Sequence, residues 1–160
     1  MNKIHNEAKK LYRSLKGNIN IPSLIKYIEK FGYSVVFFHT EEGDEILRAY
    51  GLTHEDKKAF TYCGTTKMVF IDGNLPTRNQ IYSLLHECGH ISLRHIGDDD
   101  IDLFDSREIE NEAEAFAYTV LNYHKIADKQ FIPLFVAGGA LILMQGIKLY
   151  NLKRARRAEG

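Results

Sequence analysis

Two histidines four residues apart, with a glutamate directly after the first, are the residues of this sequence that could do chemistry. They belong to the run His86-Glu87-Cys88-Gly89-His90. On a helix, residues at this spacing lie on one face, so both imidazole rings can bind one metal ion. Zinc accepts two imidazoles, takes a third protein ligand and keeps one position for water. The spacing therefore predicts a hydrolytic metal site in which Glu87 takes a proton from that water.

The two histidines lie in a segment that is typical of an amphipathic helix. Thr77 and Gln80 have the spacing of a capping box, so the helix is predicted to begin near Thr77 and to continue to about His95. Apolar residues recur at helical spacing along one side of this segment, and His86 and His90 fall nearly opposite them. This placement predicts a helix whose apolar face is buried and whose opposite face, with His86 and His90, lines a cleft.

A second predicted helix, over residues 108–123, supplies the candidates for a third ligand. Glu112 borders the apolar stripe of this helix, so its carboxylate can reach a cleft. Glu108 flanks the same side and is a candidate to support a ligand histidine through its ring N–H. Glu110 and Glu114 are expected to belong to a solvated face. We therefore expect Glu112 to complete the site.

Three segments of the chain share the pattern of a known family. Residues 86–95 read HECGHISLRH, residues 110–117 read ENEAEAFA, and residues 67–76 read KMVFIDGNLP. Together they resemble the ImmA/IrrE metallopeptidases, in which a strand and turn lead into the active-site helix. The likeness covers about residues 33–123. It departs from the family at Glu114, where Asn or Asp is usual, and in lacking the apolar-proline ending after the second helix.

This resemblance implies a zinc-dependent endopeptidase with a minimal, gluzincin-like zincin domain. It implies that His86, His90 and Glu112 are the metal ligands and that Glu87 is the catalytic base. Manganese could occupy the same ligands. Family members typically cleave helix-turn-helix repressors of mobile elements or stress regulons, so the implied partner is such a repressor.

A second interpretation is a regulator that binds metal but does not catalyse. Such a protein would bind or sequester a repressor without cutting it, and it could do so while tethered to a membrane. A purely structural zinc site is normally closed by four protein ligands and has no need of Glu87. The sequence therefore favours catalysis.

Length and composition predict one small domain inside the cell. The chain has 160 residues, of which 44% are hydrophobic and 26% are charged, so it can bury one modest core. Its formal net charge is +0, so no direct binding of nucleic acid is expected. Residues 1–16 are amphipathic rather than secretory, and Cys63 and Cys88 have no metal-type Cys-x-x-Cys partner. We therefore expect a reducing, cytoplasmic location.

The remaining pattern predicts an α+β fold, with a short mixed or antiparallel sheet packed against the two motif helices. Two more helices are expected ahead of them, over residues 1–16 and 21–32. The expected strands cover residues 33–40, 59–63 and 67–71, the first of them closed by a turn at 41–44. By analogy with similar peptidases, strand 67–71 is expected to bind the substrate as an added strand. Tyr123 is the preferred oxyanion stabiliser, and the other candidates are His39, His95 and His124.

The C-terminal region, residues 129–160, is expected to be separate from the metallopeptidase domain, residues 1–128. Gln145 is the one polar side chain among the 17 residues of segment 131–147, and a basic tail follows. A membrane span usually needs about 20 apolar residues, whereas core helices are seldom apolar all round. Two interpretations therefore stay open, namely a membrane anchor with a cytoplasmic tail, or a helix that packs on the domain or between two copies.

Overall fold

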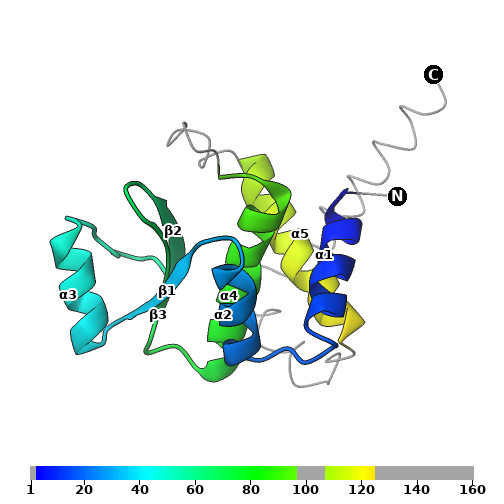
Figure 1. Ribbon diagram of the computed structural model, residues 1–160, viewed down its shortest axis with the longest axis horizontal. Helices are drawn as coiled ribbons and strands as arrows, with labels where there is room; N and C mark the ends of the chain where they lie inside the picture. The colour runs from blue at the N-terminus through cyan, green and yellow to red at the C-terminus, as the bar shows by residue number, and fades with distance from the viewer. Residues whose placement is uncertain (1–2, 97–106, 125–160) are drawn as a thin grey trace. The chain divides into compact units, whose positions relative to one another are not determined.

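The two motif helices lie side by side next to a small sheet in a computed structural model, which describes residues 3–96 and 107–124 (Figure 1). The predicted domain boundary at 128/129 and the apolar segment 131–147 lie outside these residues. Within the described part of the chain, no helix is both long enough and apolar enough to cross a membrane.

Five helices and three strands are present in the described residues, which confirms the predicted α+β class. The helices are α1 (Lys3–Ser14), α2 (Ile21–Glu29), α3 (Glu41–Ala49), α4 (Thr77–Leu93) and α5 (Arg107–Tyr123). The strands are β1 (Ser34–Phe38), β2 (Ala59–Cys63) and β3 (Lys67–Asp72). Every helix and strand expected within the described residues is therefore found, and α3 is an addition.

The sheet is mixed, and β3 is its central strand. β1 pairs with β3 in parallel, with Val36 opposite Phe70, and β2 pairs with β3 antiparallel, with Thr61 opposite Val69. Both sides of β3 are therefore used by neighbouring strands, so it cannot accept a further strand. The expectation that this strand binds the substrate backbone is wrong. Of the two edge strands, β2 is the one that packs against α4.

The two faces of the sheet enter two separate apolar clusters, because alternate residues of a strand point to opposite faces. The larger cluster receives Val69 and Ile71 of β3 and is otherwise built mainly from α1, α2, α4 and α5. The smaller cluster lies between the sheet and α3 and consists of Val36, Phe38, Leu47, Met68 and Phe70. Helices α3 and α4 thus cover opposite faces of the sheet (Figure 1).

Helix α3 corrects the expectation that residues 41–44 form only a turn. Thr40 is its N-cap, and the Thr40 side chain accepts a hydrogen bond from the backbone N–H of Gly43 at 3.0 Å. Glu41, Glu42 and Asp44 lie in the first turn, where negative charge is favourable. The helix has only nine residues, so its apolar periodicity is too brief to distinguish it from a turn.

Helix α4 begins at the predicted position but without the predicted capping box. Pro76 occupies the N-cap position and Thr77 is already helical. Gln80 Nε2 instead donates hydrogen bonds to the carbonyls of Gly73 at 3.1 Å and Leu75 at 2.9 Å. Gln80 therefore fixes the turn that precedes the helix, and this stabilises the same boundary through a different set of bonds.

Candidate metal centre

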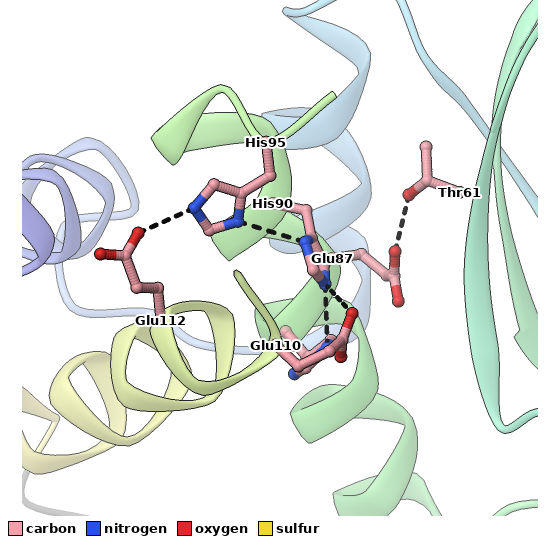
Figure 2. Close-up of polar contacts among 7 residues, drawn as sticks. Thr61, Glu87, His90, His95, Glu110 and Glu112 are labelled. Carbon is pink, nitrogen blue, oxygen red and sulfur yellow. Dashed lines mark hydrogen bonds and ion pairs between the residues drawn. The ribbon is translucent and has the colours of Figure 1, made fainter. Parts of the chain in front are cut away.

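His86 and His90 from α4 and Glu110 from α5 bring their ligand atoms together, and Figure 2 shows Glu110 against His90. The Nε2 atoms of the two histidines are 3.0 Å apart. The Glu110 carboxylate lies 3.1 Å from His86 Nε2 and 3.4 Å from His90 Nε2. Zinc binds histidine nitrogen at about 2.0–2.1 Å, which puts tetrahedral ligand atoms roughly 3.3 Å apart. The donor types and their spacing therefore fit a divalent cation.

Glu110, and not Glu112, is the acidic residue that the structure brings to the two histidines. Glu112 Oε2 lies instead 3.0 Å from His95 Nε2 (Figure 2). The helix crossing explains this difference, because α4 meets α5 where Gly89 touches Ala113. Glu110 precedes Ala113 by three residues and shares its face, whereas Glu112 is rotated by about 100°. Glu110, which was expected on a solvated face, thus occupies the position beside the histidines that was expected of Glu112.

Gly89 allows α4 and α5 to approach this closely. A Cβ atom at Gly89 would lie 3.0 Å from both the Cα and the carbonyl oxygen of Ala113, and 3.3 Å from the Cβ of Phe116. Contacts this short require the neighbouring atoms to give by a few tenths of an ångström, which close-packed helices resist. The glycine inside the motif therefore sets the distance across which Glu110 reaches the histidines.

Replacing Gly89 by valine is expected to weaken zinc binding by roughly tenfold to 100-fold, the range found when the supports of a metal ligand are removed. The added side chain would push α5 away and carry Glu110 with it. Competition with a chromophoric chelator measures the affinity, and circular dichroism checks the helix content. Ala115→Val adds similar bulk to α5 away from the crossing and is expected to keep the affinity. An unchanged affinity in a folded Gly89→Val variant would count against this role.

A chain of hydrogen bonds holds His90 from behind. His95 Nδ1 lies 3.2 Å from His90 Nδ1, and His95 Nε2 lies 3.0 Å from Glu112 Oε2 (Figure 2). For His90 Nε2 to bind a metal, its Nδ1–H must donate to His95 Nδ1, and His95 Nε2–H then donates to Glu112. Glu112 would thus support His90, a candidate ligand, through His95. This supporting role was expected of Glu108.

Burial and the neighbouring charges shift the pKa values of His90 and Glu110, although not that of His86, in directions that suit metal binding. Burial, assisted by the neighbouring His86 ring, lowers the pKa of His90 to about 4. Burial opposes charge on His86 as well, but the hydrogen bond to Glu110 and the nearby Glu87 carboxylate raise its pKa. The same hydrogen bond from His86 lowers the pKa of Glu110. A neutral His90 and an ionised Glu110 are the forms that bind a metal.

Glu87 lies next to the cluster on the side of the sheet. Its side chain is buried, and Thr61 of β2 donates a hydrogen bond from Oγ1 to Glu87 Oε2 at 2.6 Å (Figure 2). Burial raises the pKa of Glu87, while the adjacent His86 and the Thr61 hydrogen bond oppose that rise. A buried carboxylate that a hydroxyl orients beside metal ligands is suited to accept a proton. Nothing in the sequence marks Thr61 as a partner of Glu87, because only the packing of β2 on α4 brings the two residues together.

The preferred oxyanion candidate lies far from these residues. Tyr123 Oη is 2.6 Å from His5 Nε2 of α1. At 1.5 Å per residue, Tyr123 lies roughly 20 Å from Glu110 along α5. His124 packs against the ring of Tyr12. The expectation for Tyr123 is therefore wrong, and of the other candidates only His95 lies near the metal cluster.

Comparison with known proteins gives the family. The family model Peptidase_M78, described as an IrrE N-terminal-like domain, matches residues 29–131. This range contains both motif helices and the whole sheet, and it confirms the resemblance seen in the sequence. No curated protein and no solved structure matches the chain. Because the family model covers well over half of its residues, this chain belongs to the Peptidase_M78 family of IrrE N-terminal-like domains.

Proposed function

We propose that this protein is a zinc-dependent endopeptidase. The family suggests a metallopeptidase role. The observation that carries the proposal is a buried carboxylate, Glu87, next to a three-residue ligand group that does not include it. Catalytic zinc sites take three protein ligands and keep a position for water, whereas structural sites normally take four. This arrangement supports catalysis over a purely structural role.

In the proposed mechanism, His86, His90 and Glu110 would hold the ion. When bound, zinc supplies Lewis acidity and lowers the pKa of a coordinated water to about 7. Glu87 accepts the proton of the attacking water and then donates it to the amine that leaves. Because Thr61 donates its hydrogen bond to Glu87 Oε2, we assign the transferred proton to the other oxygen, Oε1. Manganese at the same ligands is the alternative to zinc.

We propose that the substrate backbone pairs with β2. This strand is an edge of the described sheet, since its partner is β3 alone. An extended peptide can pair with such an edge through its main chain. Because Thr61 of β2 contacts Glu87, a peptide along this edge would pass beside the proton acceptor. The substrate must therefore offer an extended segment at the cut.

The proposed substrate is a helix-turn-helix repressor of a mobile element or a stress regulon. This part of the proposal rests on the resemblance of the sequence to the ImmA/IrrE metallopeptidases, whose members typically cleave such repressors. The net charge of +0 gives the protein no bulk attraction to nucleic acid, so any contact with DNA would be made by the repressor. The proposed site of action is the cytoplasm.

Incubation of the purified protein with purified host or phage repressors tests this function. We expect repressor fragments with new N-termini, identified by mass spectrometry, when the purified proteins are mixed with zinc. Removing the metal with a chelator should stop the cleavage, and adding zinc back should restore it. A repressor that binds the zinc-loaded protein but stays intact would favour the sequestering regulator instead.

A further inference from the structure

A second group of metal-ligating side chains lies on the opposite face of the sheet from Glu87. It consists of His39, which follows β1, Asp44 in the first turn of α3, and His54, which precedes β2. One potential ligand atom from each residue lies within 4.8 Å of the other two. The two imidazole rings meet edge to face, with centroids 4.6 Å apart. The three residues therefore converge although they come from three separate elements.

The local backbone places Asp44 beside His39. The backbone N–H of His39 donates to Asp44 Oδ1 at 2.7 Å, which leaves Oδ2 to bind a cation. A Cβ atom at Gly43 would lie 1.9 Å from the carbonyl oxygen of Phe37, so the first turn of α3 lies directly against the end of β1. His39 itself has a left-handed φ of 61°, which is uncommon for a residue with a side chain. The close approach of α3 thus holds this carboxylate in place.

Packing fixes the orientation of His54. Its ring stacks on the ring of Phe38, with centroids 4.7 Å apart and an interplanar angle of 18°. Phe38 is fully buried in the apolar cluster between the sheet and α3, so it gives His54 a rigid support. A ligand whose ring is already oriented loses little entropy when it binds a metal.

A second carboxylate lies near this group. Asp72 Oδ1, at the end of β3, is 3.9 Å from His39 Nε2. Histidine ligands usually have a carboxylate or a carbonyl next to their other ring nitrogen, which orients the ring and raises its basicity. The same Asp72 oxygen accepts a hydrogen bond from the backbone N–H of Asn74 at 2.8 Å, which holds the carboxylate in position.

We propose that His39, Asp44 and His54 bind a second divalent transition-metal ion. Two imidazoles and one carboxylate favour zinc among the common cellular cations, whereas calcium and magnesium prefer oxygen ligands alone. The ion would join the end of β1, the start of α3 and the segment that leads into β2. It would therefore stabilise the sheet from the face opposite the catalytic residues. This inference does not depend on the proposed peptidase function.

Zinc stoichiometry of the full chain tests the proposal. We expect the wild-type protein to bind two equivalents of zinc in calorimetric titration, and His54→Asn and His90→Asn to bind one equivalent each. The double variant should bind none. Glu45→Gln, which removes an exposed carboxylate from the same helix, is the matched control and should keep both equivalents.

Asp44→Asn provides an independent test that does not depend on the stacked ring. The asparagine can still accept the hydrogen bond from the backbone N–H of His39. The substitution removes the charged ligand, however, so the variant protein should also bind one equivalent of zinc. Circular dichroism confirms that each variant is folded. A folded His54→Asn or Asp44→Asn protein with two equivalents of zinc would overturn the proposal. A wild-type protein with a single equivalent, lost in His90→Asn, would overturn it as well.

Discussion

Replacing Glu87 by glutamine is expected to lower the kcat of peptide cleavage by roughly 10²–10⁴-fold, the usual contribution of a general base. The amide has nearly the shape of the carboxylate, and its oxygen can still accept the hydrogen bond from Thr61. It cannot take a proton from water at neutral pH. Because Glu87 is not a member of the ligand group, zinc content should stay at the wild-type level. Fragment formation gives kcat, and elemental analysis gives the zinc.

Glu114→Gln is the control for this variant. Glu114 accepts a hydrogen bond from Tyr82 at 3.3 Å and, like Glu87, is an acidic residue of a motif helix outside the metal-ligand group. We expect its kcat to remain within a few-fold of the wild-type value. A Glu87→Gln protein that cleaves as fast as wild type would show that another group accepts the proton.

Replacing Glu110 by glutamine is expected to weaken zinc binding by at least about 100-fold, the upper end of the losses seen when only the support of a ligand is removed. Glu110 contacts both His86 Nε2 and His90 Nε2, so its carboxylate is the charged member of the ligand group. Glu112→Gln should weaken binding by less than about tenfold, because the glutamine oxygen can still accept the His95 N–H.

The two substitutions form a matched pair. Both change glutamate to glutamine near the start of α5, and the two side chains are 51% and 38% exposed, so neither should disturb folding much. Titration against a chelator of known affinity gives the two dissociation constants. The reverse order, with Glu112→Gln the weaker binder, would restore Glu112 as the third ligand.

The parts of the site that depend on one helix alone were predictable from the sequence. His86 and His90 lie on one face of α4 because residues four apart always do so in a helix. The bounds of β2 also followed from local pattern, since β-branched and aromatic residues are bounded there by polar and glycine-rich turns. These features need no knowledge of what packs against them.

The identity of the third residue could not be predicted in this way. Whether Glu110 or Glu112 faces α4 depends on the rotation of α5 about its axis, and the contact between Gly89 and Ala113 sets that rotation. The apolar stripe of α5 indicates which side is buried but not which part of that side meets α4. A glycine within the motif was the available signal for a close helix crossing.

The order of the strands in the sheet is the second feature that the sequence could not predict. The sequence indicates three strands, but the order β1-β3-β2 depends on the pairing of β1 with β3, two segments that are far apart in the chain. This order makes β3 central and β2 an edge, and it brings Thr61 to Glu87. The role of Thr61 therefore becomes visible only once the sheet is assembled.

A crystal structure of the full chain grown with zinc, with anomalous data at the zinc edge, tests the central claim most directly. We predict an anomalous peak about 2 Å from His86 Nε2, from His90 Nε2 and from a Glu110 carboxylate oxygen, with Glu87 unbound beside it. A folded protein with no peak at this position would contradict the account. A zinc ion that also binds a fourth protein ligand would contradict the account equally, because no position would remain for water.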